Sequence, residues 1–381
     1  MESRKKKIAV IGTRGIPATY GGIEKHCEKL YSLIFKSGYD VTIYARKFYF
    51  NEDIKEFNGI KLVKIHVPNI QGAEAFIYSF IATILAVFSN ADIIHFHAQG
   101  PTLFSWIPRL FTPNKKVVFT CHGIDWQRGK WGLIGKTVIK LGEKASAIFP
   151  HSVITVSQSL ADYYKKKYNI NTVKIVNGTD IPDKTPLKTV KDKFGLKEKE
   201  YFIFVGRLVP EKDTETLIKA MKKLKTDKKL LIVGDTEDIN YFNYLKNMAN
   251  GDNRIIFTGY CFGKDLNELY SNAFAYVTAS KLEGLPITVL EAMSYSLPVI
   301  MSNIEPHNEI KNYNENNFIS FETSNVGDCK TAMEKMLFNV DINMKKILEN
   351  IADSQKKIIR EHFSWEKAAE ETLKIYEEVI K

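Results

Sequence analysis

Two glutamates flank the segment of this sequence that is best suited to chemistry. Glu283 stands directly before residues 284–286, GLP, and Glu291 is the eighth residue after Glu283. Because proline is favoured in the first turn of a helix, we expect a helix to begin here, with the free N–H groups of Ile287 and Thr288 directed at an anion. The two carboxylates could then accept hydrogen bonds from sugar hydroxyls. Glutamates at this spacing occur by chance in many helices, so the EGLP context carries more weight than the spacing.

Two cations follow the first strand predicted in the second half of the chain. Arg207 and Lys212 lie in residues 205–213, VGRLVPEKD. Open α/β sheets bind ligands at the carboxyl ends of their strands. A diphosphate in that place needs such cations, Arg for fork-shaped contacts and Lys as a point charge. The alternative is a pair of solvated side chains on a loop.

A glycine-rich turn follows the first predicted strand of the chain. Gly12 and Gly15 enclose Arg14, and Gly21 and Gly22 stand at a predicted helix start. Glycine lets the backbone approach a ligand closely, and a helix N-terminus favours anions. The spacing departs from the GxGxxG of dinucleotide-binding turns. Such turns are common in α/β proteins, so this one alone indicates little.

Histidines close two of the predicted strands in the first half. His95 and His97 alternate along one strand and therefore share a face. A metal-binding pair is one interpretation, but no third ligand is evident in the sequence. We therefore expect the pair to line a cleft or lie in the core, and we expect no metal site. His122 ends the next strand, and Asp125, three residues on, is explained equally well as a helix cap.

The elements that carry these residues form two series of alternating strands and helices. Runs rich in Ile, Val and Phe alternate with helical stretches in both halves, which is typical of parallel sheets covered on both faces. Residues 22–37 give the clearest helix, with one apolar face and Gly38 at its end. The polar stretch 177–200 separates the two series. We therefore predict two doubly wound α/β domains that face each other, and a last helix over residues 364–381.

Charge and cysteine content limit the partners and the compartment. Residues 1–178 carry 25 Lys and Arg against 12 Asp and Glu, a net charge of +13, and the remainder carries 54 − 25 = 29 against 44 − 12 = 32, a net charge of −3. The basic half is either ordinary solvated surface or faces an anionic partner such as lipid headgroups, a pyrophosphate-linked acceptor or nucleic acid. Four scattered cysteines suit a reducing compartment and argue against a zinc module. Without a signal-peptide pattern at the start, we expect a cytoplasmic protein.

Two apolar features of the basic half bear on a membrane. The fourteen residues 75–88, AFIYSFIATILAVF, are too few to span a bilayer, which takes roughly 20. We expect a buried helix packed on a sheet, with a helix at a membrane surface as the alternative. Trp126 and Trp131, with Arg128 and Lys130 between them, could grip an acceptor or a lipid surface.

Together these motifs resemble the retaining glycosyltransferases of family 4. Glu283 to Glu291 matches the E-x7-E motif of that family, and Arg207 with Lys212 matches its diphosphate pair. The resemblance extends through GGIEKH at 21–26, HG at 122–123, NGTD at 177–180, TGY at 258–260 and FSWE at 363–366. The opening GTRGIPATYGGIEKH and residues 122–131 resemble a branch that builds bacterial surface polysaccharides and includes rhamnosyltransferases. One departure is Pro286, where many relatives have glycine, so a phosphate contact there must come from Ile287 or Thr288.

The resemblance implies the GT-B fold, with two Rossmann-like domains. Residues 1–178 would bind the acceptor, residues 179–362 the nucleotide sugar, and a helix at 363–381 would return to the first domain. The chemistry implied is metal-independent, retains the configuration of the anomeric carbon, and needs no cofactor beyond the donor. The catalytic residues implied are Arg207, Lys212, Glu283, His122 and Asp125; those implied for donor binding are Gly21, Gly22, Gly206, Gly259, Tyr260, Gly284, Leu285, Ile287, Thr288 and Glu291.

Each implied residue has a role in transfer. Arg207, Lys212 and the helix start would stabilise the departing diphosphate. Glu291 would hold the ribose hydroxyls and Glu283 the transferred sugar, while His122 would face that sugar. The backbone near Gly259 and Tyr260 would meet the base. No residue is implied as a covalent nucleophile, because the leaving phosphate is thought to act as the base.

We therefore expect a transferase that extends a saccharide or lipid-linked acceptor at the inner face of the cell membrane, bound there peripherally through the basic half. One alternative is a nucleotide-sugar epimerase of similar architecture, which release of free nucleoside diphosphate would exclude. Another is a non-enzymatic protein that binds anionic ligands, with affinity that falls steeply with salt. Nothing in the sequence requires nucleic acid as a partner. The donor sugar, its base and the acceptor are not evident.

Overall fold

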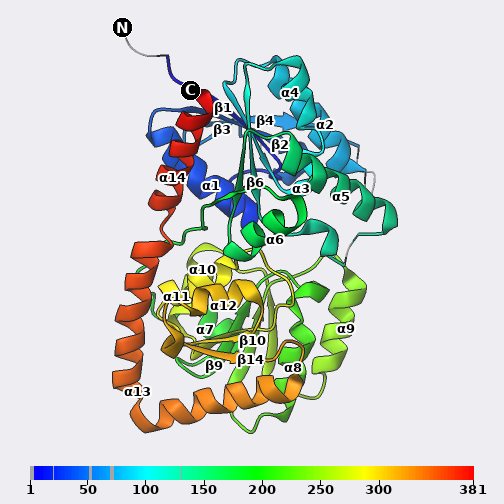
Figure 1. Ribbon diagram of the computed structural model, residues 1–381. Coiled ribbons are helices and arrows are strands. Elements are labelled where there is room, and N and C mark those ends of the chain that lie inside the picture. Colours follow the sequence, from blue (N-terminus) through cyan, green and yellow to red (C-terminus); the bar gives the residue numbers. More distant parts are fainter. Residues whose placement is uncertain (1–3, 20, 51–53, 69–72, 130) are drawn as a thin grey trace. The chain divides into compact units, whose positions relative to one another are not determined.

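The computed structural model describes residues 4–19, 21–50, 54–68, 73–129 and 131–381, with only the backbone for residues 316 and 339–352. The chain divides into two compact units (Figure 1). Unit 1 comprises residues 1–178 and 365–381, and unit 2 comprises residues 179–364. The described part of each unit is a layered α/β structure.

Unit 1 is built on an eight-stranded sheet in the order β3-β4-β2-β1-β5-β6-β7-β8. Its strands pair in parallel except for the short hairpin of β3 with β4. The strands are β1 (Lys7–Ile11), β2 (Asp40–Arg46), β3 (Glu56–Phe57), β4 (Ile60–Ile65), β5 (Ile93–His97), β6 (Lys116–Cys121), β7 (Ser152–Thr155) and β8 (Val173–Lys174). The helices are α1 (Gly22–Lys36), α2 (Glu74–Phe88), α3 (Gln99–Thr102), α4 (Trp106–Phe111), α5 (Leu133–Ile148), α6 (Gln158–Tyr168) and α14 (Trp365–Ile380), with 3-10 turns η1 (Lys47–Tyr49) and η2 (Asp125–Gln127).

Unit 2 is built on a six-stranded, all-parallel sheet in the order β11-β10-β9-β12-β13-β14. Its strands are β9 (Tyr201–Val205), β10 (Lys229–Val233), β11 (Ile255–Gly259), β12 (Ala275–Thr278), β13 (Val299–Ser302) and β14 (Phe318–Phe321). Its helices are α7 (Thr189–Phe194), α8 (Thr214–Lys223), α9 (Ile239–Ala249), α10 (Gly263–Asn272), α11 (Ile287–Ser294), α12 (Glu305–Lys311) and α13 (Val326–His362), with 3-10 turns η3 (Pro210–Lys212) and η4 (Glu315–Asn317).

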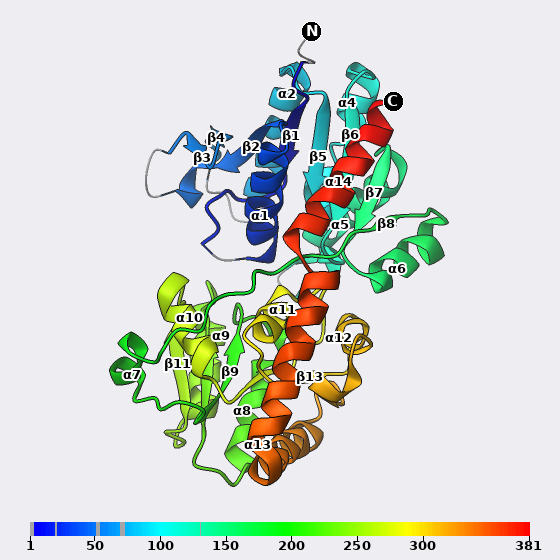
Figure 2. The same cartoon turned by 90° about the vertical axis from the view of Figure 1, so that its left-hand side faces the viewer.

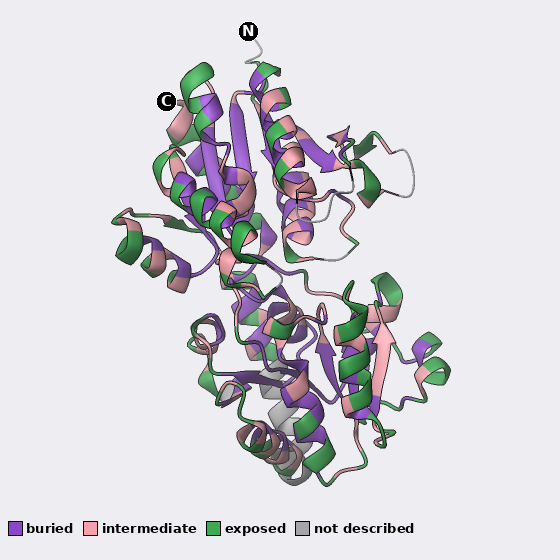
Figure 3. Cartoon of the chain, turned by 90° about the vertical axis from the view of Figure 1, so that its right-hand side faces the viewer, coloured by how far each residue is buried: buried purple, intermediate pink, exposed green. Residues whose placement is uncertain are grey.

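The inner strands of both sheets are buried on both faces, which is why they read as continuous apolar runs (Figure 3). In unit 2 the core lies between β9, β10, β12 and the helices α8, α9 and α13. Parallel strands joined by helices confirm the doubly wound α/β class predicted for both halves. Because the strands of a parallel sheet end at the same edge, the loops that follow β9, β10, β11 and β12 gather there.

The last helix belongs to the unit that begins the chain. Helix α14 packs against α1, and Figure 2 shows it, in red, beside the strands of unit 1. Tyr376 of α14 is fully buried. Its hydroxyl lies 2.6 Å from His95 Nδ1 on β5, so α14 contributes a polar contact as well as apolar surface to this core.

Helix α2 corresponds to the long apolar run of the sequence, but it is buried on one side only. Tyr78, Ala82 and Ala86 are buried, whereas Phe76 and Phe88 are exposed. The prediction of a buried helix is therefore wrong for its outer side, because α2 packs on unit 1 with a single face. No helix in the described part of the chain combines the length and the apolar character needed to cross a bilayer.

Candidate functional site

Lys212 and Glu283 form a partly buried ion pair in unit 2. Lys212 ends η3, which follows β9, and Glu283 lies in the loop between β12 and α11. The distance from Lys212 Nζ to Glu283 Oε1 is 2.5 Å, and the side chains are 18% and 13% exposed. Burial opposes ionisation of Glu283, but the charge and the hydrogen bond of Lys212 outweigh it and hold the pKa of that carboxyl below its ordinary value. The Glu283 carboxylate is therefore charged at neutral pH.

The loop that holds Glu283 is tied to the loop that holds Lys212. Strands β9 and β12 are parallel neighbours, so their carboxyl ends lie side by side. Lys281 donates its backbone N–H to the carbonyl of Glu211 at 2.8 Å. Its Nζ also lies 3.1 Å from Asp213 Oδ1. These two contacts flank the central ion pair and fix its position.

Arg207 is half-buried directly after Gly206 at the end of β9. The backbone approaches closely here, because a Cβ on Gly234 would lie 1.8 Å from the carbonyl oxygen of Gly206. Gly234 has φ +144° and donates its N–H to the carbonyl of Gly259 at 2.9 Å. Gly234 therefore joins three strand ends, β9, β10 and β11. Sequence reasoning missed it, although it follows strand KLLIV as Gly206 follows strand YFIFV.

Helix α11 begins at Ile287, with Pro286 as its extended N-cap residue. The first backbone hydrogen bond of this helix runs from Val289 N to Pro286 O, so the N–H groups of Ile287 and Thr288 precede it, as predicted. Gly284, Leu285 and Ile287 are buried, and Thr288 is half-buried. Tyr276 on β12 donates its hydroxyl to Thr288 Oγ1 at 2.9 Å. The start of α11 is thus held against the sheet by a side-chain hydrogen bond.

Glu291 is half-buried in α11 and is held by a tyrosine that sequence reasoning missed. The Tyr270 hydroxyl donates to Glu291 Oε2 at 3.1 Å. Tyr270 is buried and stacks on Tyr295, with ring centroids 5.0 Å apart and planes 11° apart. Burial, followed by the charge of Glu291, raises the pKa of Tyr270, so this hydroxyl stays protonated and remains a donor.

Gly259 and Tyr260 close β11 at the same edge of the sheet. Gly259 has φ +71°, a conformation that favours glycine. The Tyr260 ring stacks on Phe262 with centroids 5.7 Å apart, and both rings are exposed. The Tyr260 hydroxyl donates to the carbonyl of Asp235 at 3.2 Å. Two exposed stacked rings beside a glycine form a flat apolar surface.

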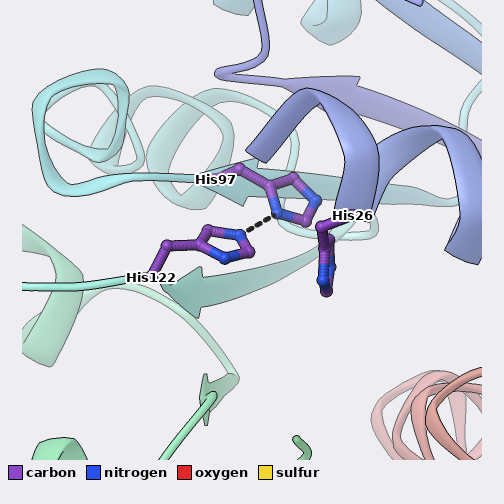
Figure 4. Close-up of side chains that lie close together, drawn as sticks. All are labelled: His26, His97 and His122. Carbon is purple, nitrogen blue, oxygen red and sulfur yellow. Dashed lines mark hydrogen bonds between the residues drawn. The ribbon is translucent and has the colours of Figure 1, made fainter. Parts of the chain in front are cut away.

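His122 lies in a histidine cluster of unit 1 (Figure 4). His122 Nε2 is 2.9 Å from His97 Nδ1, and the ring centroid of His26 lies 4.6 Å from that of His122 and 5.3 Å from that of His97. His97 and His26 are buried and His122 is half-buried. No third ligand beside the pair on β5 was evident in the sequence; the structure brings His26 of α1 and His122 close to His97. His95 is stacked on His97 outside this cluster and is fully buried, which confirms a core position for it.

Asp125 begins η2 and is engaged with its neighbours. Its Oδ2 accepts from the N–H of Gln99 at 3.3 Å, and its Oδ1 lies 3.1 Å from Arg128 Nε. The Trp126 indole N–H donates to the buried carboxylate of Glu143 at 2.6 Å. Asp125 does not cap η2, whose N-cap is Ile124 and which has no side-chain cap hydrogen bond; its carboxylate instead joins η2 to the start of α3 through Gln99. Lys130 lies outside the described residues.

The glycine turn of unit 1 carries a paired arginine. Gly21 has φ +109° and caps α1, which begins at Gly22. Arg14 Nε lies 3.0 Å from Glu24 Oε1 in α1. A Cβ on Gly21 would lie 2.1 Å from Glu24 Oε2, so glycine leaves room for this ion pair. The structure thus places Gly21, Gly22, His122 and Asp125 in unit 1, and Arg207, Lys212, Glu283 and Glu291 in unit 2.

Comparison with known proteins relates both units to one enzyme class. A family model described as Glycosyltransferase Family 4 matches residues 20–181, and one described as Glycosyl transferases group 1 matches residues 188–370. An uncharacterized glycosyltransferase of Methanocaldococcus jannaschii, MJ1607, is 25% identical over 97% of both chains. The UDP-Gal:alpha-D-GlcNAc-diphosphoundecaprenol alpha-1,3-galactosyltransferase of Escherichia coli is 30% identical over 57% of this chain and 59% of that protein.

Solved structures share the fold along the whole chain. Sucrose-phosphate synthase from Thermosynechococcus elongatus superposes with a TM-score of 0.82 at 19% identity, over 98% of this chain and 99% of that one. HepE from Anabaena, solved with UDP-glucose, superposes with a TM-score of 0.78 at 17% identity, over 98% and 99%. The superpositions agree with the two parallel-sheet units on the fold, and the two family matches agree with each other on the enzyme class. The chain is a glycosyltransferase with the GT-B fold.

Proposed function

We propose that this glycosyltransferase moves a sugar from a nucleoside-diphosphate donor bound by unit 2 onto a saccharide or lipid-linked acceptor, with retention at the anomeric carbon. The acceptor would be a growing surface polysaccharide. The Lys212–Glu283 ion pair beside the start of α11 carries this proposal, since it places a cation, a carboxylate and helix N–H groups at one edge of the sheet. HepE was solved with UDP-glucose, which supports a nucleotide sugar as the donor class.

Binding of the donor would change which groups are paired at this edge of the sheet. Arg207, Lys212 and the N–H groups that begin α11 would stabilise the negative charge that grows on the diphosphate as it leaves. Fixed positive groups accelerate a reaction most when they stabilise charge that develops in the transition state. No Mg²⁺ or Mn²⁺ is then needed at the diphosphate. Once Lys212 turns toward phosphate, the Glu283 carboxylate can accept hydrogen bonds from the transferred sugar. Glu291, held by Tyr270, would accept from the ribose hydroxyls, and the Tyr260 surface would meet the base.

The transfer step balances without a covalent enzyme intermediate. The acceptor oxygen forms the new bond to the anomeric carbon while the bond from that carbon to the diphosphate oxygen breaks. The acceptor proton passes to a diphosphate oxygen, and the leaving diphosphate departs on the face that the acceptor enters. Because the acceptor enters on the face from which the diphosphate leaves, the anomeric carbon keeps its configuration.

The reaction is tested by measuring nucleoside-diphosphate release from a panel of UDP-, GDP- and dTDP-sugars, with and without a polyprenyl-diphosphate saccharide as acceptor. We expect release from one donor, without added Mg²⁺ or Mn²⁺ and in the presence of EDTA, and we expect its loss in Glu291→Ala. NMR of the product should show the anomeric configuration of the donor. Activity that returns only with Mg²⁺ or Mn²⁺ would contradict the metal-independent diphosphate site, and an inverted product would contradict retention.

We further propose that the enzyme works bound peripherally to an anionic membrane through unit 1. Helices α2, α4 and α5 expose large apolar side chains: Phe76, Phe80, Leu85, Phe88, Leu110, Phe111, Leu133, Ile134, Leu141 and Ile148. Helix α2 contacts α4 and α3, and α3 contacts α5, so these helices follow one another along one side of the unit (Figure 1). Lysines 140 and 144 are exposed on α5 among these apolar residues. Exposed apolar groups beside cations suit an anionic lipid surface.

Vesicle sedimentation tests the membrane proposal. We expect the wild-type chain to pellet with vesicles that contain anionic phospholipid and to remain in the supernatant with zwitterionic vesicles. Leu133→Ser with Ile134→Ser, at the start of α5, should lower the bound fraction. The control is Ile239→Ser, which removes another exposed apolar residue at the start of α9 in unit 2. Equal binding by the double variant and the control would contradict this surface.

A further inference from the structure

The histidine cluster of unit 1 contains a buried nitrogen that makes no hydrogen bond to any residue the structure describes. This atom is His26 Nε2. The His26 side chain is only 4% exposed, so bulk water does not compensate it. Its other nitrogen, Nδ1, lies 2.8 Å from Asn177 Oδ1. Because an amide oxygen can only accept, Nδ1 carries the proton, and Nε2 presents a lone pair.

Three imidazoles converge around this lone pair (Figure 4). One ring nitrogen from each of His26, His97 and His122 lies within 4.8 Å of the others. They come from three different elements, α1, the end of β5 and the residue after β6. The β1–β5–β6 order of the sheet places these ends beside one another. The arrangement is therefore fixed by the sheet and by α1 rather than by one flexible loop.

The outer nitrogens of two of these rings already have partners that would orient them. His97 Nε2 lies 2.7 Å from the Tyr31 hydroxyl, which leaves Nδ1 directed at His122. His26 is oriented by Asn177 in the same manner. A histidine that binds a metal through one nitrogen usually donates its other N–H to such an acceptor, which fixes the tautomer and the ring plane.

We propose that His26, His97 and His122 bind one zinc ion, with the fourth position open. Three imidazoles without a thiolate form a set that suits Zn²⁺. Zn–N distances of about 2.0–2.1 Å require ligand nitrogens roughly 3.3 Å apart in a tetrahedron. The present separation of 2.9 Å between His97 Nδ1 and His122 Nε2 needs only a small opening of that hydrogen bond. Three protein ligands with one open position are typical of catalytic zinc, where a water or a ligand oxygen completes the tetrahedron.

This ion is separate from the reaction proposed for unit 2. It uses none of the residues assigned to the diphosphate, although it shares His122 with the residues that the family resemblance implies at the transferred sugar, and its binding is measured without donor or acceptor. Failure of the transfer proposal therefore leaves this site standing, and the reverse also holds. Because His122 is the one ligand that is half-buried, the ion would hold this ring in a fixed orientation at the accessible side of the cluster.

The test is a metal titration of the full, untagged chain after chelation and dialysis into metal-free buffer. We expect one equivalent of Co²⁺ to produce the visible absorption of a four-coordinate site, and one equivalent of Zn²⁺ to remove it. His26→Gln should weaken Zn²⁺ binding at least 100-fold, and Asn177→Ala, which removes only the orienting acceptor, roughly 10–100-fold. The matched control is His66→Gln, an exposed histidine of unit 1 outside the cluster, which should bind as the wild type does.

Two results would overturn the site. One is a wild-type chain that binds neither Co²⁺ nor Zn²⁺ in stoichiometric amount. The other is a His26→Gln variant that retains wild-type affinity. If the variants fail to fold, as judged by circular dichroism, X-ray absorption of the zinc-loaded wild type decides instead: three imidazole nitrogens are expected at about 2.0–2.1 Å, and fewer would exclude this ligand set.

Discussion

Lys212 and Glu283 neutralise each other across 2.5 Å. The cation expected at the diphosphate and the carboxylate expected at the sugar are thus partners before either meets a donor. A donor that engages both must separate them, and its own phosphate and hydroxyl groups replace the lost contact. The ion pair therefore compensates two partly buried charges that a bound donor would compensate in its place.

Lys212→Met should damage both stability and turnover. The substitution leaves the Glu283 carboxylate buried without its cation, which should lower the free energy of unfolding by about 1–3 kcal/mol. Loss of a positive group at the developing diphosphate charge should lower kcat about 10²–10³-fold. Urea unfolding and nucleoside-diphosphate release measure the two effects. Lys212→Met combined with Glu283→Gln should regain stability but not activity.

An ion pair with more exposed side chains, 31% and 42%, provides the control for that double substitution. Lys330 and Glu334 lie one helical turn apart on α13, 2.7 Å from each other at the surface. Lys330→Met should change the free energy of unfolding by less than about 0.5 kcal/mol. We expect the double variant to lose less unfolding free energy than the sum of the losses in Lys212→Met and Glu283→Gln. A loss equal to that sum would show that the pair has no coupling energy.

Tyr270→Phe should raise KM for the donor about tenfold, an effect of about 1.4 kcal/mol, with little change in kcat. The variant keeps the buried ring and removes only the hydroxyl that orients Glu291. Initial-rate kinetics with varied donor separate KM from kcat. Tyr295→Phe is the control, because Tyr295 stacks on Tyr270 but its hydroxyl donates to Asn267. An equal effect of both substitutions would assign the loss to general packing.

Glu268→Gln should destabilise unit 2 at neutral pH and lose its effect in acid. Glu268 Oε2 accepts from the backbone N–H groups of Lys188, Thr189 and Val190 at the start of α7. Burial alone would raise the pKa of Glu268, but these hydrogen bonds lower it below its ordinary value. The carboxylate therefore stabilises the fold above its unfolded-state pKa of about 4.3, and this stabilisation is lost as the pH falls through the folded-state value.

Urea unfolding at several pH values measures this dependence. At pH 7 the variant should be less stable by about 2 kcal/mol, and the difference from the wild type should shrink below about pH 4. Glu370→Gln, at an exposed position on α14 paired with Lys374, should behave as the wild type at each pH. A difference for Glu268→Gln that stays constant with pH would show that charge is not the cause.

Gly234→Ala should destabilise unit 2 by about 2–5 kcal/mol. Part of the cost is the left-handed backbone, about 1–2 kcal/mol, and part is the clash with the Gly206 carbonyl, about 1–3 kcal/mol. Gly251→Ala separates the two, because Gly251 has φ +82° with nothing within 4 Å of its Cβ position. Comparison of the two unfolding free energies in urea isolates the clash, and equal losses would contradict it.

The sequence predicted the sheets better than it predicted the neighbours of the site. Strands β9, β10 and β12 are recognisable because strands buried on both faces are continuously apolar. Strand β14 was missed, since it is a four-residue edge strand beside β13 whose two central residues are only half-buried. Helix α2 was predicted as buried because its apolar residues run all round, while the fold covers one face.

Contacts between side chains that are far apart in the chain could not be predicted from the sequence. The motif predicted Lys212 and Glu283 as site residues, but their ion pair depends on β9 and β12 being neighbours. His26 joins His97 only because α1 packs beside the carboxyl end of β5. In each case the residue types can be recognised in the sequence, whereas the order of the strands determines which of these residues are in contact.

The return of α14 to unit 1 affects the order in which the two units can be completed during synthesis. Residues 179–364 leave the ribosome as one uninterrupted segment, so unit 2 has all of its chain available before α14 is made. Unit 1 is translated first, yet it lacks residues 365–381, including the Tyr376 hydroxyl that contacts His95, until the whole of unit 2 has been made. A product terminated before α14 would therefore carry a whole unit 2 and an unfinished unit 1. The first part of this enzyme to be made is the last to be finished.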